Sequence, residues 1–330
     1  MTRLNIRLGT TETAMNAFLS INRPWRLVGP LCLPLLAAIL LAYTAAVSSA
    51  ERSQAYAWRL ELDAGSVKQF KTSVDTGGDF DINRYLLQLS AMRKVGENGS
   101  VGLTLSYGES RYRFSGNTGF AGLDPWGTIR EARVAVPLRY RYDSTWTFYG
   151  IPSLRYRAET GAKLSDSDKW GVLAGASYRF SDRLTIGPGV GIFAKLNSGI
   201  DLSPILLIDW KITDTLSLTT GSDLVASRGP GLSLTWLPVP RWAFGLSGRL
   251  EKISFQLDKD GPAPNGIGRD KSIPLAISAT YEAQKAVRLH LLAGVEFAGN
   301  LRLKDSDGDP IADSDYATAP FVGLLITLRP

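Results

Sequence analysis

The chain has 330 residues, with 37 Lys and Arg against 31 Asp and Glu, one Cys and one His. Its formal charge of +6 is too small to indicate a nucleic-acid-binding protein. A single Cys allows no internal disulfide, and one His and one Cys leave mainly oxygen ligands for any metal site.

The first fifty residues differ from the rest of the chain. Four arginines precede an apolar run from Leu27 to Val47, and small residues follow it up to Ala50. This order is typical of a signal peptide, so we predict a cleaved leader at 1–50 and an exported domain at 51–330. Removing the leader also removes the cysteine and leaves a formal charge of about +3. A transmembrane anchor is the alternative, although Pro30 and Pro34 shorten its helical part.

Beyond residue 51, apolar and polar residues alternate, which is typical of strands with two different faces. Between 130 and 142, for example, Val134 and Tyr140 fall on one face, whereas Arg133 and Arg139 fall on the other. The pattern predicts strands near 56–62, 84–93, 101–113, 129–142, 146–157, 170–180, 184–195, 204–212, 216–221, 231–237, 242–255, 273–281, 287–302 and 320–328.

The connections between these strands alternate in length. Short ones near 181–182, 213–214, 238–240 and 284–285 alternate with long polar ones such as 114–128, 257–271 and 304–317. Short periplasmic turns and long extracellular loops are the pattern of outer-membrane barrels. We therefore predict an all-β fold, a transmembrane antiparallel up-and-down β-barrel of about fourteen strands, with twelve possible because 216–221 is weak.

Aromatic residues beside the short turns share the apolar face of their strands. Rings at this level predict an interfacial girdle. The residues are Trp146, Tyr178, Phe180, Trp210, Trp236, Trp242 and Tyr281.

The glycine-rich stretch from Arg183 to Leu196, RLTIGPGVGIFAKL, fits no phosphate-binding loop. Gly187, Gly189 and Gly191 stand at every second position, whereas dinucleotide and P-loop motifs require other spacings. At period two the three glycines share one face, so we interpret the stretch as a wall strand. Its glycine face is predicted to point into the lumen and to leave room there for bulky neighbours or a passage.

Four segments together resemble an uncharacterised family of bacterial outer-membrane barrels. They are TFYGIPSLRYRAETG, WGVLAGASYRFSDRLTIGPGVGIFAK, GPGLSLTWLPVPRWAFGLSGRLEKISFQLD and LRLKDSDGDPIADSDYATAPFVGL. The resemblance implies a barrel fold and an outer-membrane location, without a substrate. More distantly, the strand count is similar to that of fourteen-stranded transporters for fatty acids and aromatic hydrocarbons. The last strand also resembles the signal read by the barrel-assembly machinery, although its customary final aromatic is missing.

The inward face carries more basic than acidic residues. Guanidinium groups in a lumen bind carboxylate or phosphate, so the excess predicts affinity for anionic or amphiphilic solutes. The alternative is that the charges pair across the lumen as a polar plug. The binding candidates are Arg133, Arg139, Arg155, Asp209, Arg249, Glu251, Arg288 and His290.

Two further features could carry chemistry. His290 is the only histidine, and a barrel hydrolase would need a serine beside it, such as Ser247 or Ser278, but no spacing selects one. In the loop KDSDGDPIADSD, Asp305, Asp307 and Asp309 resemble a calcium loop that lacks the closing Glu. We expect no catalytic residues and no cofactor, with weak surface Ca²⁺ or Mg²⁺ binding, bridging lipopolysaccharide phosphates, as a hypothesis.

The function predicted from the sequence is that of an outer-membrane barrel and passive channel or binding barrel for small solutes. It would be surrounded by membrane lipid and lipopolysaccharide, and it would bind no nucleic acid. The alternatives are a lipid-modifying barrel enzyme, a structural or adhesive barrel without transport, and a soluble β-protein held by an uncleaved anchor.

Overall fold

The computed structural model describes residues 58–163, 167–197, 199–220 and 230–329. The predicted signal peptide at 1–50 lies outside the described residues. Within the described ranges, no helix has both the length and the apolar character needed to cross a membrane.

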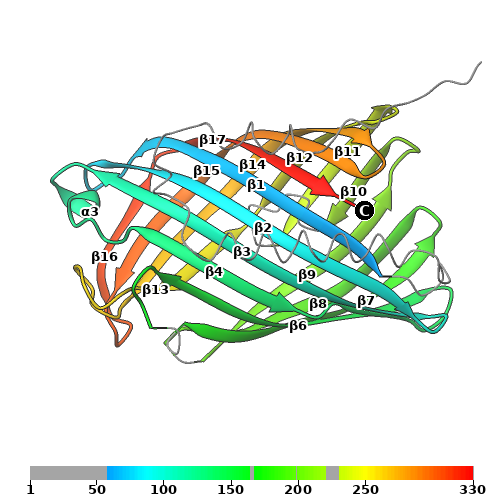
Figure 1. Ribbon diagram of the computed structural model, residues 1–330, viewed down its shortest axis with the longest axis horizontal. Coiled ribbons are helices and arrows are strands. Elements are labelled where there is room, and N and C mark those ends of the chain that lie inside the picture. The colour runs from blue at the N-terminus through cyan, green and yellow to red at the C-terminus, as the bar shows by residue number, and fades with distance from the viewer. Residues whose placement is uncertain (1–57, 164–166, 198, 221–229, 330) are drawn as a thin grey trace, which may run out of the picture. The chain divides into compact units, whose positions relative to one another are not determined.

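The described part of the chain forms a closed barrel (Figure 1). Seventeen strand segments make one sheet, which closes where Leu62 to Gln69 pair antiparallel with Phe321 to Leu328. The segments are β1 (Arg59–Ser73), β2 (Asp79–Val95), β3 (Gly99–Ser115), β4 (Thr128–Ala135), β5 (Leu138–Arg141), β6 (Trp146–Glu159), β7 (Asp168–Ser181), β8 (Leu184–Ala194), β9 (Ile200–Lys211), β10 (Leu216–Thr220), β11 (Gly231–Val239), β12 (Trp242–Arg249), β13 (Glu251–Gln256), β14 (Ile267–Gln284), β15 (Val287–Lys304), β16 (Pro310–Tyr316) and β17 (Ala319–Leu328).

Three pairs of segments are interrupted halves of single wall strands. Strand β6 pairs with both β4 and β5, β14 with both β12 and β13, and β15 with both β16 and β17. Counting each pair once gives fourteen antiparallel wall strands, which confirms the predicted barrel. Pro137 lies in the first interruption, as expected of a residue that cannot donate to a ladder. Pro152, Pro188 and Pro274 lie within strands.

The two ends of the barrel differ. One end carries the short turns, such as 142–145, 182–183 and 285–286. In the first of these turns, the backbone N–H of Trp146 and both the hydroxyl and the N–H of Thr145 donate to Asp143, and these hydrogen bonds lower the pKa of Asp143 below its usual 3.8. The opposite end carries the longer connections, including the one-turn helix α3 (Gly119–Gly122).

The strands extend further toward the long-loop end than predicted. Strand β1 continues to Ser73, β2 begins at Asp79, and β14 begins at Ile267. The predicted loop at 304–317 is also mostly strand, because β16 covers Pro310 to Tyr316. These predictions were wrong because, at this end, apolar residues lie on the inward face of the strands and charged residues lie on the outward face.

Strand β2 shows the change most clearly. Near the long loops, Phe80 and Ile82 are buried inside, while Asp79 and Asp81 face outward and pair with Lys71, Lys68 and Arg113. Farther along, the inward face carries Arg84, Gln88 and Ser90, and the outward face carries Tyr85, Leu87 and Leu89. The apolar side of one strand therefore moves from inside to outside, although its pairing with β3 keeps one continuous register.

The inward apolar residues at the long-loop end form one core, and we call this region the cap. Its buried members come from β2, β3, α3, β4, β13, β15, β16, β17 and connections next to them: Val74, Phe80, Ile82, Tyr112, Phe120, Ala121, Trp126, Ile129, Phe255, Leu257, Ala263, Leu301, Leu303, Tyr316 and Ala319. Trp126 lies at its centre, with edge-on contacts to four other rings at centroid distances of 5.1–5.8 Å. The four rings are those of Tyr112, Phe114, Phe120 and Phe255.

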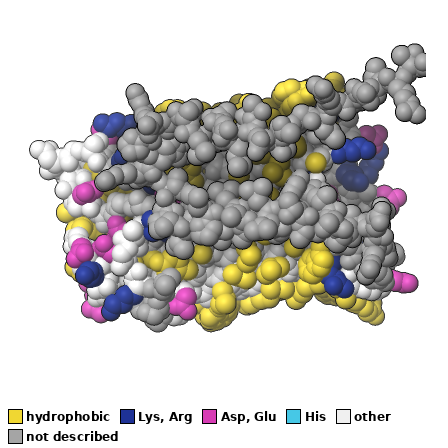
Figure 2. Space-filling model, viewed as in Figure 1, with side chains coloured by type: hydrophobic (Ala, Val, Ile, Leu, Met, Phe, Trp, Pro, Cys, Tyr) yellow, Lys and Arg dark blue, Asp and Glu magenta, His cyan; other side chains and the backbone are white. Residues whose placement is uncertain are grey.

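The rest of the barrel, which we call the spanning part, has an apolar exterior. Leu105, Leu154, Leu206, Ile277 and Leu291 are among its exposed side chains. In Figure 2, hydrophobic side chains gather along the lower middle and right, whereas charged and polar ones gather at the left end, where Figure 1 shows α3, β13 and β16.

The aromatic girdle predicted beside the short turns is present. Trp146, Trp210, Trp236 and Trp242 are 38–50% exposed. Neighbouring rings touch across strands, with Trp146 at 5.1 Å from Tyr178 and Trp242 at 4.8 Å from Tyr281 between ring centroids. An apolar exterior bordered by such rings matches the hydrocarbon and interface of a bilayer.

Candidate functional site

The interior is divided by a contact between strands that are far apart in the sheet order. At the long-loop end, Gln256 of β13 pairs in parallel with Ala158 of β6. The cap core lies on one side of this contact. On the other side, β6 to β9 line a large cavity together with residues that β13 and β14 turn away from the core, such as Lys252 and Arg269.

The cavity has a volume of about 1100 Å³ and is strongly basic. Its lining extends from Thr145, at a short turn, to Lys195 and Lys304 at the opposite ends of their strands. Two aspartates line it, Asp201 and Asp209, against ten basic side chains: Arg133, Arg139, Arg155, Arg157, Lys169, Arg179, Lys195, Lys252, Arg269 and Lys304.

Like charges lie directly opposite each other on one wall of the cavity. In the register, Arg133 of β4 pairs with Arg155 of β6, and Arg155 pairs with Lys169 of β7. Arg133 and Lys169 form no ion pair among the described residues, and the buried Nε of Arg133 has no hydrogen-bond partner. Like charges in direct cross-strand register are destabilising unless something compensates them.

Glu131 of β4 is an acidic residue beside these arginines, and it lines the small cavity of about 50 Å³ and not the large one. It binds Arg157 closely, with Nε and Nη2 both 2.7 Å from Oε2, and lies 3.6 Å from Arg155 Nε. One carboxylate therefore contacts the guanidinium groups of two neighbouring β6 arginines. Arg157 is the closer partner, at 2.7 Å, and Arg155 the more distant one, at 3.6 Å.

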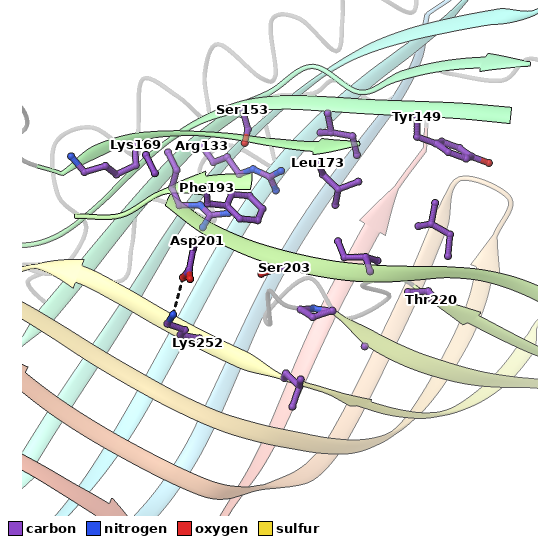
Figure 3. Close-up of a pocket in the computed structure, with 18 of the residues that line it drawn as sticks. Arg133, Tyr149, Ser153, Lys169, Leu173, Phe193, Asp201, Ser203, Thr220 and Lys252 are labelled. Carbon is purple, nitrogen blue, oxygen red and sulfur yellow. Dashed lines mark hydrogen bonds and ion pairs between the residues drawn. The ribbon is translucent and has the colours of Figure 1, made fainter. Parts of the chain in front are cut away.

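An aromatic ring lies beside these arginines (Figure 3). The guanidinium carbon of Arg155 is 5.9 Å from the centre of the Phe193 ring, and Figure 3 shows Arg133 next to the same ring with the Lys169 ammonium extended away from it. A Cβ on Gly171 or Gly191 would lie within 2.5 Å of Phe193 ring atoms. The glycine face therefore leaves room for a bulky neighbour, as the sequence predicts, and Phe193 is that neighbour.

An ion pair crosses the cavity near the long-loop end. Lys252 Nζ of β13 donates to Asp201 Oδ2 of β9 at 2.8 Å, as the dashed line in Figure 3 shows. This pair joins the outward face of the cap to the opposite cavity wall. Both side chains are about half exposed, which leaves the pair in contact with solvent.

Beneath the cap, a second group of charged residues is sealed from solvent. Arg84 Nη1 lies 2.7 Å from Glu296 Oε1 and Nη2 lies 3.7 Å from Asp270 Oδ2. The hydroxyls of Tyr112 and Tyr316 donate to Asp270 at 2.8 and 3.1 Å. A cavity of about 50 Å³ adjoins Arg84 and also Arg157 and Glu251, so it has room for only a few water molecules.

The structure separates the predicted binding residues into three places. Arg133, Arg139, Arg155 and Asp209 line the large cavity. Arg249 and Glu251 are buried, at 4% and 5% exposure, on the inward face of β12 and β13. Arg288 and His290 belong to neither group. Arg288 is 3.7 Å from Glu282, and the ring nitrogens of His290 contact the hydroxyls of Thr280 and Thr327 at 2.9 and 3.3 Å.

Several lining residues were not among the predicted candidates. Alternation in the sequence already places Arg157 and Arg179 on the inward face, although they were not chosen as binding candidates. Lys169 shares that parity but precedes the predicted strand 170–180. Lys252 and Arg269 have the outward parity of their strands. They reach the cavity only because β13 crosses to β6, and no local pattern signals that contact.

The aspartates of the predicted calcium loop act within a turn. Oδ1 of Asp305 accepts hydrogen bonds from the backbone N–H groups of Asp307 and Asp309, at 3.0 and 2.8 Å. Across the described ranges, no group of three or more His, Cys, Asp or Glu side chains is placed to hold a metal ion. The alternating pattern therefore has a local structural explanation in turn formation.

No family model matches the sequence, and no curated protein matches it. An outer membrane channel from Pseudomonas putida F1 has a TM-score of 0.45 at 9% identity, over 82% of this chain and 95% of that one. A FadL homologue from Pseudomonas aeruginosa has a TM-score of 0.42 at 11% identity, over 82% and 89%. The Pseudomonas putida toluene transporter TodX has a TM-score of 0.39 at 10% identity, over 82% and 89%. At these values the likenesses assign neither a family nor a solute, and the predicted family resemblance stays a prediction.

Proposed function

We propose that this protein is an outer-membrane barrel that conducts small anionic solutes passively through the basic cavity, without catalysing a reaction. The observation that carries the proposal is the charge of the lining, ten basic side chains against two aspartates, with Arg133 and Arg155 in direct register. Such a lining raises the local concentration of anions and lowers that of cations.

The membrane location is supported by the surface of the spanning part. A soluble protein would not expose Leu154, Leu206, Ile277 and Leu291 at 56–64% on strands of one barrel. A closed barrel also leaves no unpaired strand edge in lipid, and the Trp and Tyr girdle suits one interface.

The buried charged group beneath the cap limits where a solute can pass. Arg84 binds both Asp270 and Glu296, and these buried side chains fill the interior beneath the cap, so solutes have no room there. The sealed charges support a polar plug in one part of the interior, and the basic cavity supports a solute-binding lumen in the other, so the two alternatives from the sequence are compatible. Transport is then confined to the side bounded by β6 to β9.

The test is the reversal potential in a KCl gradient across a planar bilayer that contains the refolded protein starting at Glu51. We expect stable conductance with anion preference. The triple substitution Arg133→Gln, Arg155→Gln and Lys169→Gln should lower the anion-to-cation permeability ratio several-fold.

The matched control removes three positive charges from the outside of the cap. Lys68→Gln, Lys71→Gln and Arg113→Gln should leave the permeability ratio unchanged, because these side chains pair with Asp79 and Asp81 on the exterior. Cation preference in the unmodified protein, or no conductance from protein whose heat-modifiable gel migration shows a folded barrel, would contradict the proposal.

A further inference from the structure

We infer that Arg133, Arg155 and Phe193 form a binding site for an organic carboxylate whose apolar or aromatic body lies against the cavity wall. The inference deepens the proposed function, because it names the class of anion that the cavity selects. Its three side chains come from one side of the barrel. Arg133 lies on β4, Arg155 on the neighbouring β6, and Phe193 on β8, which is separated from β6 by β7.

The first argument is that the positive charges of Arg133 and Arg155 are incompletely paired. Arg133 and Arg155 lie directly opposite each other, and the buried Nε atoms of both lack hydrogen-bond partners. Buried donors of this kind cost free energy until an acceptor reaches them. A carboxylate between the two guanidinium groups would accept from both, in the planar geometry that guanidinium favours.

The second argument is the position of Glu131. Its Oε2 is already bound by Arg157 at 2.7 Å, and its Oε1 remains 3.6 Å from Arg155 Nε. Glu131 thus holds the arginine cluster in place without saturating Arg155. The side chain of Arg155 is also 29% exposed, so a solute in the cavity can reach it.

The third argument is the apolar surface next to the charges. Phe193 lies over Gly171 and Gly191, where no other side chain could fit beneath the ring. Leu173 and Ile205 also line the cavity. An inorganic anion such as phosphate gains nothing from these surfaces, whereas the body of an aromatic or aliphatic carboxylate buries its apolar area against them.

Arg155 and Phe193 are expected to have different roles in binding, which can be tested separately. Arg155 should bind the carboxylate of any ligand, and Phe193 should discriminate by the ligand's body. A ring contact contributes about 0.5–1.5 kcal/mol beyond burial, which corresponds to about a 2- to 13-fold change in affinity. A hydrogen bond to a charged group contributes more, so loss of Arg155 should weaken binding about tenfold or more.

The experiment is a titration of refolded protein from Glu51 with 4-fluorobenzoate, followed by ¹⁹F NMR line broadening, with benzoate, acetate and phosphate as competitors. We expect benzoate to compete at concentrations at least tenfold below acetate or phosphate. Arg155→Gln should weaken both carboxylates, and Phe193→Leu should weaken benzoate several-fold while leaving acetate unchanged. Arg113→Gln, on the exterior, is the control for charge and should leave all affinities unchanged.

Equal competition by acetate and benzoate would overturn the inference, as would binding that survives Arg155→Gln in protein with normal heat-modifiable migration. Such results would leave the proposed function intact if the reversal potential still shows anion preference. Conversely, benzoate binding that depends on Arg155 and Phe193 in a barrel without conductance would support the site and contradict passive conduction.

Discussion

The cap and the spanning part use the same strands with opposite faces turned inward. On β3, Tyr112 is buried inside the cap and Arg113 faces outward, whereas Thr104 faces the interior of the spanning part and Leu105 is 41% exposed outside. The cap follows the rule of a soluble protein, and the spanning part follows the rule of a barrel in lipid. The difference teaches that the surroundings of a strand, and not its pairing, decide which face is apolar.

The level at which the faces exchange is also where the sealed charges lie. Arg84, the first polar inward residue of β2 below Phe80 and Ile82, is the centre of the Arg84–Glu296–Asp270 group. A polar interior directly under an apolar core cannot be reached by water in quantity, so its charges must satisfy one another. On the side of β6 to β9, which the cap core does not fill, the same kind of interior is open, and its ten basic side chains outnumber the two aspartates.

The largest expected effect comes from breaking the sealed group. Arg84→Met should lower the free energy of unfolding by about 3–5 kcal/mol, because it leaves buried Glu296 and Asp270 without their cation. Urea unfolding in lipid vesicles, followed by tryptophan fluorescence, measures it. Arg113→Met removes an exposed partner of Asp81 and should change the same quantity by less than about 1 kcal/mol. Equal effects of the two substitutions would show that the group is not sealed.

The cap core can be tested in the same assay. Phe255 is fully buried and contacts the Trp126 ring at 5.1 Å, so Phe255→Ala should cost about 3–5 kcal/mol. Phe244, 40% exposed on the adjoining β12, lies on the exterior of the spanning part and is the matched control. Phe244→Ala should cost clearly less in lipid vesicles. A similar cost at both positions would mean that the cap does not fold as a core of its own.

A charge on the outward face should be tolerated on the cap and should be destabilising on the spanning part. Leu105→Arg places a cation on the apolar exterior of the spanning part and should cost about 2–4 kcal/mol if the position lies near the bilayer midplane. Arg113→Leu, eight residues along the same outward face, should be nearly neutral because that position lies on the cap. If Arg113→Leu were the more damaging of the two, the assignment of the zones would be reversed.

The smallest effect is expected at the short-turn end, away from the exchange. Hydrogen bonds from Trp146 and Thr145 lower the pKa of Asp143 below 3.8 in the folded protein, so they stabilise the fold above the unfolded pKa. That contribution is lost as the pH falls through the lower folded pKa. The difference in unfolding midpoint between the unmodified protein and Asp143→Ala should therefore be present at neutral pH and vanish in strong acid. A difference that is constant from neutral pH to about pH 2 would show that these hydrogen bonds do not involve the ionised carboxylate.

The sequence predicted the spanning part well and the cap poorly. Alternation placed Arg133, Arg139 and Arg155 inside and the girdle outside, because one rule holds from the short turns up to the level of Arg84. Beyond that level the rule reverses, so the outward-apolar pattern predicts loops where the structure has the ends of β1, β2 and β14 and the whole of β16. Lys252 could not be assigned to the cavity because its place depends on the contact between Gln256 and Ala158, which are far apart in the chain.

The most direct test of the divided interior is the reactivity of single cysteines. Protein starting at Glu51 lacks Cys32, the only cysteine, so each introduced thiol is unique. Ser153 and Ser203 line the open cavity, and Ser272 is 4% exposed on the inward face of β14 next to Asp270. In the folded barrel, we predict that an anionic methanethiosulfonate reagent modifies Ser153→Cys and Ser203→Cys rapidly, and faster than its cationic counterpart, while Ser272→Cys reacts only after unfolding. Equal reactivity at all three positions, or preference for the cationic reagent in the cavity, would contradict an interior divided into an open basic side and a sealed one.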